Sequence, residues 1–161
     1  MGLRDRIKGA LGLGAHTHLT EGAAAPALDI PDASGKVWKL ADLRGKPAVI
    51  YFYPKDDTPG CTKEACAFRD QLSRYNGAVV LGVSTDDSRS HTAFTQKFNL
   101  NFPLLADARG EVAVRYGVLS GKTARRVTFV IDREGRIAKV FEPVSVSGHA
   151  DEVRAALAEL P

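Results

Sequence analysis

The amino-acid sequence predicts a three-layer α/β sandwich in which helices flank a mixed central β-sheet. Two observations support this fold class. Strand-like apolar runs alternate with segments of helical periodicity along the first part of the chain, which is typical of parallel strands joined by helices. Two further strand-like runs, Val127–Ile131 and Ile137–Phe141, are separated by a short turn that contains Gly135. We therefore expect an antiparallel hairpin to follow the parallel part.

Length and composition are those of one domain. The chain has 161 residues, of which 44% are hydrophobic, so it can bury one substantial core but falls short of what two cores usually need. Lys and Arg total 22 against 19 Asp and Glu, and the basic residues are scattered rather than gathered into a stripe. No apolar run approaches the roughly 18 residues of a membrane span. We expect neither a nucleic-acid partner nor a membrane partner.

We place the domain at residues 22–161 and treat residues 1–21 as a separate tail. Leu3, Ile7 and Leu11 recur at helical spacing before a stretch rich in Gly, His and Ala, so the tail is either a short amphipathic helix or has no regular structure. Its basic start has the charge of a signal peptide. The apolar stretch that follows is interrupted by glycines and is shorter than the roughly 7 to 15 residues of such a signal. We therefore expect a cytoplasmic protein.

The first predicted elements lead to a central strand and a helix. Residues 26–40 have an extended pattern that ends in a short strand over 37–40. The run Pro47–Tyr53 (PAVIYFY) is continuously β-branched and aromatic between a glycine and a proline, which is typical of a strand buried on both faces. The segment 61–75 then has apolar residues at helical spacing, so a helix follows the central strand directly.

The later elements repeat this alternation and end with the hairpin and a helix. In chain order we expect a strand over 78–84, a helix over 90–98, an extended piece over 102–105, a short helix over 111–116, the two hairpin strands and a closing helix from about residue 150.

Cys61 lies where a helix begins. Thr58 is a typical N-cap residue and Pro59 suits the first helical position, so Cys61 is predicted to be the third residue of the helix. There its sulfur lies near unpaired backbone N–H groups and the positive end of the helix dipole, which favours a nucleophilic thiolate. The alternative is a small buried apolar residue, because Cys61 also extends the apolar stripe that includes Ala65 and Phe68.

Two cysteines are too few for a disulfide framework, so we expect their role to be reactivity, metal binding or packing. Cys66 follows Cys61 by five residues, about 140° around a helix at 100° per residue, so the two sulfurs point apart on an intact helix. By itself this position is compatible with a packing role for Cys66. The four-residue gap argues against a thioredoxin-type dithiol oxidoreductase, which usually has Cys-x-x-Cys.

A metal-binding module is the other alternative class. The histidines lie in unrelated segments without the spacing of metal ligands, so we expect surface histidines and no metal. They are His16, His18, His91 and His149.

The segment YFYPKDDTPGCT, followed by KEAC, resembles the active-site signature of the Q-type peroxiredoxins, also called bacterioferritin comigratory proteins. The likeness extends from about Gly22 to Pro161 and includes the stretches DLRGKPAVIYFYPKD, GVSTDD, FPLLAD, YGV and RVTFVID. It implies a thioredoxin-like fold and a thiol-dependent peroxidase that reduces hydrogen peroxide and organic hydroperoxides.

The resemblance also implies roles for particular residues. Cys61 would be the peroxidatic cysteine that becomes a sulfenic acid, and Cys66 the resolving cysteine that forms a disulfide with it. Thr58 would hydrogen-bond the peroxide and the thiolate, and Pro59 would shield the sulfenic acid from water. Arg126 would support the thiolate and polarise the peroxide. The neighbouring Arg125 points to the opposite face of a strand, and the family pattern selects Arg126.

No bound cofactor is required, because the sulfur carries two electrons per turnover and a dithiol partner returns them. That partner is a thioredoxin or a glutaredoxin, between which the sequence does not choose. We expect a monomer, because no uncovered apolar stripe remains once the core is assigned.

Overall fold

The structure, a computed structural model, describes residues 16–161. Within this range the central sheet has five strands in the order β5-β4-β3-β8-β9. β3 pairs in parallel with β4, and β4 with β5, whereas β8 is antiparallel to both β3 and β9. The strands are β3 (Ala48–Phe52), β4 (Val79–Ser84), β5 (Leu104–Ala106), β8 (Val127–Ile131) and β9 (Ile137–Phe141). The predicted mixed sheet is confirmed.

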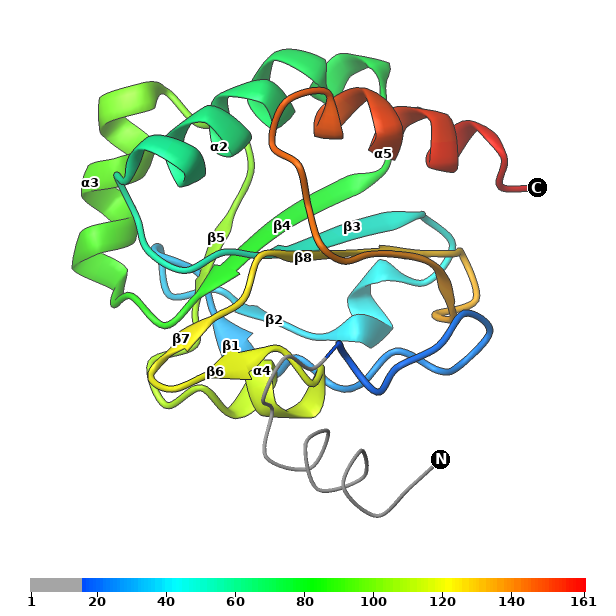
Figure 1. The fold of residues 1–161 in the computed structure, drawn as a ribbon, viewed down its shortest axis with the longest axis horizontal. Helices are drawn as coiled ribbons and strands as arrows, with labels where there is room; N and C mark the ends of the chain where they lie inside the picture. The colour runs from blue at the N-terminus through cyan, green and yellow to red at the C-terminus, as the bar shows by residue number, and fades with distance from the viewer. Residues whose placement is uncertain (1–15) are drawn as a thin grey trace.

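Helices cover one face of this sheet, and shorter elements cover the other (Figure 1). The first face carries α2 (Pro59–Gln71), which continues into the 3-10 helix η2 (Leu72–Arg74), together with α3 (Ser88–Phe98) and α5 (His149–Ala158). The second face carries the 3-10 helix η1 (Leu40–Leu43), α4 (Glu111–Arg115), the pair β1 (Ile30–Pro31) and β2 (Val37–Trp38), and the pair β6 (Leu119–Ser120) and β7 (Thr123–Ala124). The predicted three layers are present. We call the first face the helical face and the second the hairpin face.

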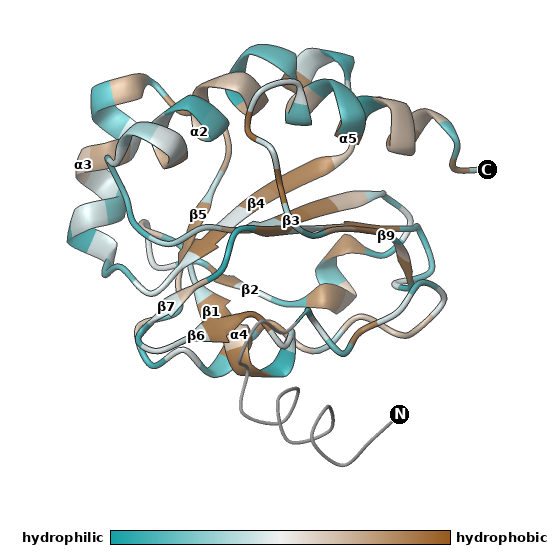
Figure 2. Ribbon diagram, in the orientation of Figure 1, coloured by the Kyte–Doolittle hydropathy of each residue, from teal (hydrophilic) through white to brown (hydrophobic). Residues whose placement is uncertain are grey.

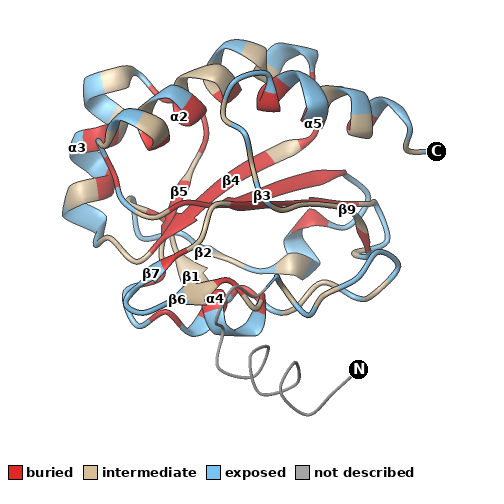
Figure 3. Cartoon of the chain, viewed as in Figure 1, coloured by how far each residue is buried: buried red, intermediate tan, exposed pale blue. Residues whose placement is uncertain are grey.

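The central strands are apolar and buried because both of their faces are covered. Every residue of β3 and β8 is buried, and β3 and β4 are coloured as hydrophobic in Figure 2 and as buried along most of their length in Figure 3. Alternate side chains enter two separate apolar clusters. Ile50 and Phe52 belong to the cluster on the hairpin face, whereas Val49 and Tyr51 belong to the cluster under the helices.

Several boundaries differ from the prediction for local reasons. The strand predicted over 37–40 ends at Trp38, because η1 begins at Leu40. The helix α3 begins two residues earlier than expected, since the Asp87 side chain accepts a hydrogen bond from Ser90 N–H and caps it. The strands β1, β6 and β7 have two residues each, which is too short for any periodicity to predict them.

The predicted helix around Leu3, Ile7 and Leu11 lies outside the described residues. Residues 16–21 of the predicted tail lie against the domain. The Thr17 N–H donates to the Glu142 carboxylate, and its hydroxyl donates to the Tyr116 carbonyl. The domain boundary at residue 22 stays a prediction.

Candidate active site

Cys61 lies near the start of α2, just after the loop that follows the central strand β3. Thr58 is the N-cap with extended backbone, and Pro59 is the first helical residue, as predicted. The Thr58 side chain makes no capping bond. Its hydroxyl donates instead to the Lys55 carbonyl at 2.9 Å. Cys61 is therefore the third residue of α2, in the turn whose N–H groups have no partner within the helix.

The Cys61 side chain is 1% exposed and contacts a guanidinium. Arg126 Nη2 donates to Cys61 Sγ at 3.3 Å. Sheet register explains the contact. Phe52 at the end of β3 pairs with Val127 at the start of β8, so Arg126 lies at the edge where α2 begins. A fixed positive charge therefore lies against the Cys61 sulfur.

Gly60 leaves room for this arginine. A Cβ atom built on Gly60 would lie 3.1 Å from Arg126 Nη2, which is closer than ordinary van der Waals contact. A side chain at position 60 would therefore press on the guanidinium that contacts Cys61.

Arg125 lies on the other face, as the strand alternation predicted. Its Nη2 donates to the Gly117 carbonyl at 2.8 Å and to Glu142 Oε2 at 3.3 Å. Of the two adjacent arginines only Arg126 contacts Cys61 in the structure. The catalytic role of Arg126 stays a prediction.

Glu64 completes the site, and the sequence analysis missed it. Its side chain is 1% exposed, and Oε1 accepts from Arg126 Nη1 at 2.8 Å. Burial raises the pKa of Glu64 from its usual 4.5 to about 7, and the Arg126 charge only partly offsets this. A carboxylate three residues after Cys61, on an otherwise apolar stripe, was the available signal.

Cys66 is half-buried on the same helix, and both cysteines are free thiols. Because α2 is continuous through both positions, their side chains diverge by about 140°. Thr58 and Pro59 lie at the helix end near Cys61, whereas Cys66 lies more than one turn away. The structure thus brings Thr58, Pro59, Cys61 and Arg126 together and leaves Cys66 apart.

The expectation of four surface histidines is wrong for two of them. His91 on α3 and His149 on α5 are buried, whereas His16 and His18 are exposed. His149 Nε2 lies 2.8 Å from Thr128 Oγ1, and burial lowers the pKa of its imidazole. Each buried ring has polar partners remote in sequence, which single-chain periodicity does not reveal.

Within residues 16–161 no group of three or more His, Cys, Asp or Glu side chains is arranged to hold a metal ion. In the same range no helix combines the length and the apolar character that crossing a bilayer requires.

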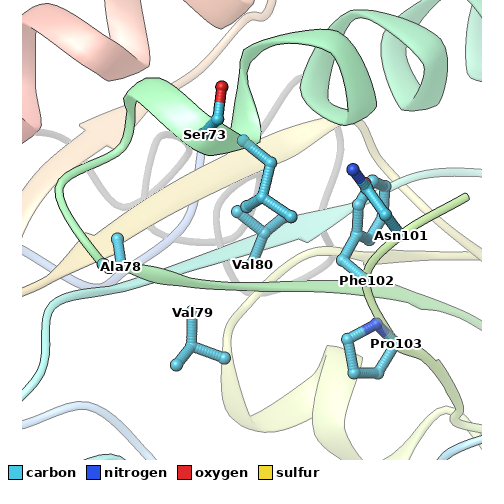
Figure 4. A pocket seen from close by; sticks show the side chains of 9 residues that line it. Ser73, Ala78, Val79, Val80, Asn101, Phe102 and Pro103 are labelled. Atoms are coloured by element: carbon cyan, nitrogen blue, oxygen red, sulfur yellow. The ribbon is translucent and has the colours of Figure 1, made fainter.

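A cavity of about 400 Å³ opens at the other end of the sheet, where β4 begins (Figure 4). Its lining includes Ser73, Val80, Asn101 and Phe102, and it contains no ionisable or thiol side chain. Cys61 and Arg126 lie outside this cavity.

The chain is similar to known proteins over a region that includes this site. A family model described as the AhpC/TSA family matches residues 22–140. A putative peroxiredoxin bcp of Coxiella burnetii is 47% identical over 142 residues, which cover 82% of this chain and 94% of the relative. The chloroplastic peroxiredoxin Q of Suaeda salsa is 46% identical over 128 residues, 76% of this chain and 60% of that protein.

Solved structures agree with these relatives. Peroxidoxin BcpB from Mycobacterium tuberculosis superposes with a TM-score of 0.82 at 37% identity, over 89% of this chain and 99% of that one. Peroxiredoxin Q from Xanthomonas campestris gives 0.80 at 36% identity, over 86% and 96% of the two chains.

Proposed function

This chain belongs to the AhpC/TSA family and is a peroxidase of the Q-type peroxiredoxins, and from that premise we propose that Cys61 is the nucleophile that reduces hydroperoxides. The contact between Arg126 Nη2 and Cys61 Sγ at 3.3 Å carries the proposal. It joins a buried sulfur at a helix N-terminus to a fixed cation, the combination that activates a thiol.

The first chemical step consumes one peroxide. The Cys61 thiolate attacks the terminal oxygen, the O–O bond breaks, and the departing oxygen takes a proton to become water or an alcohol. The sulfur is left as a sulfenic acid. Arg126 stabilises the charge that moves onto the departing oxygen. The Thr58 hydroxyl, which donates to the Lys55 carbonyl, keeps its lone pairs for the peroxide proton, and Pro59 shields the sulfenic acid.

The second step forms a disulfide between Cys61 and Cys66. The Cys66 thiolate attacks the sulfenic sulfur, the S–O bond breaks, and the departing hydroxide takes up a proton and leaves as water. Residues five apart on a helix have Cα atoms roughly 8.5 Å apart, whereas a disulfide requires about 7 Å or less and converging Cβ vectors. The first turns of α2 must therefore unwind before the bond forms. A thioredoxin or glutaredoxin dithiol then returns two electrons.

Two substitutions test this division of labour. Cys61→Ser is expected to abolish peroxide reduction. Cys66→Ala is expected to leave the first turnover intact in stopped flow and to impair steady-state turnover with a thioredoxin system. Near wild-type turnover of Cys61→Ser would show that the nucleophile is assigned wrongly.

Amide hydrogen exchange tests the unwinding. Reduced and peroxide-treated protein are compared, and a mass loss of about two hydrogens confirms the disulfide in the treated sample. Protection over residues 61–70 is expected to fall in the disulfide form. Unchanged protection would contradict the unwinding, and a missing bond would assign Cys66 to packing.

The cytoplasmic location and the monomeric state stay predictions of the sequence.

A further inference from the structure

A buried polar cluster lies beneath the loop that joins β3 to α2, and the proposed chemistry does not use it. Asp56 in this loop is 7% exposed, and His91 on α3 is 0% exposed. We call this cluster the loop anchor. It consists of Tyr53, Asp56, Ser90, His91 and the carbonyl of Leu105.

The Asp56 carboxyl group makes three side-chain hydrogen bonds. The Tyr53 hydroxyl donates to Oδ1 at 2.6 Å, and the Ser90 hydroxyl donates to Oδ2 at 2.9 Å. His91 Nδ1 lies 2.7 Å from Oδ2, and His91 Nε2 lies 2.9 Å from the Leu105 carbonyl oxygen. The loop is thereby joined to α3 and to β5 through a single imidazole.

The two ring nitrogens of His91 have different partners. A backbone carbonyl can only accept, so Nε2 donates to the Leu105 carbonyl. Nδ1 faces the Asp56 carboxyl group, and this hydrogen bond lies in a site closed to water. Breaking it would leave a buried polar group without a partner, which costs free energy.

The loop is also held through its backbone. The Asp56 N–H donates to Asp86 Oδ2 at 2.8 Å, and the Ser84 hydroxyl at the end of β4 donates to the same oxygen at 2.8 Å. Thr58 follows Asp56 by two residues, and its hydroxyl is held by Lys55 on the other side. The orientation of the Thr58 side chain is thus set by a loop that is fixed at Asp56.

We propose that Asp56 and His91 are positioning residues for peroxide reduction, which hold Thr58 and the start of α2 against Cys61. The inference rests on the proposed role of Cys61. Neither residue contacts the sulfur or Arg126 by a hydrogen bond. They act on the reaction through the loop, so their loss misplaces the peroxide-binding groups without removing any of them.

Asp56→Asn separates positioning from simple packing. An asparagine amide donates to His91 Nδ1 and to Ser90, while its oxygen accepts from Tyr53, so every hydrogen bond of the loop anchor is retained. This variant is expected to react at a near wild-type rate. Asp56→Ala, which removes all three side-chain hydrogen bonds, and His91→Leu, which removes both ring contacts, are expected to lower the rate roughly tenfold to a hundredfold.

The test measures the second-order rate constant of reduced protein with hydrogen peroxide by stopped flow. Val112→Ala, a buried substitution on the hairpin face, is the control for lost stability and is expected to react like wild type. Wild-type rates in His91→Leu or in Asp56→Ala, or an Asp56→Asn rate as low as that of Asp56→Ala, would overturn the inference. If His91→Leu does not fold, the pair Asp56→Ala and Asp56→Asn decides alone.

Cys61→Ser in the same series separates the two proposals. An inactive Cys61→Ser beside a wild-type rate in His91→Leu refutes only the positioning role. An active Cys61→Ser refutes the assignment of the nucleophile.

Discussion

The two faces of the sheet use buried polar groups differently. On the hairpin face, Asp32 accepts from its close neighbours in sequence, and Asp107 accepts from the amides of Val112 and Ala113 at the start of α4. On the helical face, Glu64 bonds Arg126 across 62 residues of sequence, and Asp56 contacts His91 across 35. Local polar bonds shape turns and helix ends, whereas the long-range ones join separate elements around Cys61.

The two faces therefore contribute differently to stability. The hairpin face packs aliphatic and aromatic side chains into one cluster and gains most of its stability from apolar burial. The helical face places charges and imidazoles in its interior, which costs free energy unless each is paired. Substitutions on the hairpin face should therefore change stability alone, and those on the helical face should change the reaction.

The largest expected change in stability is on the hairpin face. Leu28→Ala removes a fully buried side chain from that cluster and is expected to lower the free energy of unfolding by about 2 to 5 kcal/mol. The second-order rate constant of the folded protein with peroxide is expected to stay unchanged. Urea unfolding and stopped flow measure the two quantities. A slowed reaction in fully folded Leu28→Ala would mean that the two faces are not independent.

The next largest effect separates the adjacent arginines. Arg126→Met removes the donor to Cys61 and is expected to slow peroxide attack about 10²- to 10³-fold. Arg125→Met removes contacts with Gly117 and Glu142 only, so it is expected to cost stability of about 1 kcal/mol and little rate. Stopped-flow rates of the two variants, each compared with its unfolding curve, give the result. Equal slowing by both would contradict the choice of Arg126.

Glu64→Gln is expected to change the pH dependence of stability. Because the folded pKa of Glu64, about 7, is above its usual 4.5, its protonation stabilises the fold fully below pH 4.5, and this contribution is lost as pH rises through 7. Glutamine has no such titration. Relative to wild type, the variant should gain stability between these pH values, by at most about 3 kcal/mol.

Urea unfolding of reduced wild type and Glu64→Gln at pH 5, 6, 7 and 8 gives this difference directly. The other carboxylates are common to both proteins and cancel in the subtraction. A difference that does not vary with pH would mean that the Arg126 charge fully compensates the burial of Glu64.

Gly60→Ala has the smallest expected effect, and its two parts have opposite sign. Alanine favours a helix over glycine by up to about 1 kcal/mol, but its Cβ would press on Arg126 Nη2 at 3.1 Å. We expect equal or higher stability with a rate about threefold to tenfold lower. Thermal unfolding and stopped flow check both parts. An unchanged rate would show that the guanidinium adjusts freely.

The sequence predicted the elements that have a clear period and missed those that do not. The buried run at β3 and the apolar stripe of α2 were recognisable because each extends over several repeats. Most of the hairpin face consists of strands of two residues and a 3-10 helix, whose geometry depends on the sheet they cover. Their positions follow from tertiary packing rather than from local pattern.

The site divides in the same way. Cys61, Thr58 and Pro59 were predictable from the cap of a single helix, and Arg126 came from a family resemblance. The sequence did not point to Asp56, Glu64 or His91, because the side chains that pair with them are far away in the sequence. A charged residue in an apolar stripe is visible in the sequence, but the side chain that neutralises it is not.

The side chains of Cys61 and Cys66 diverge on α2. If Cys66 resolves the sulfenic acid as proposed, the stability of this helix controls how fast the disulfide forms. The first turns of α2 must unwind before the two sulfurs meet, so the rate of unwinding sets the lifetime of the sulfenic acid. During that wait a second peroxide can carry it to the irreversible sulfinic acid. The peroxide concentration that inactivates the protein then depends on the helix propensity of the residues between the two cysteines. Lys63 is exposed, so a substitution there can change the helix propensity, and with it this peroxide concentration, without altering the groups that contact Cys61.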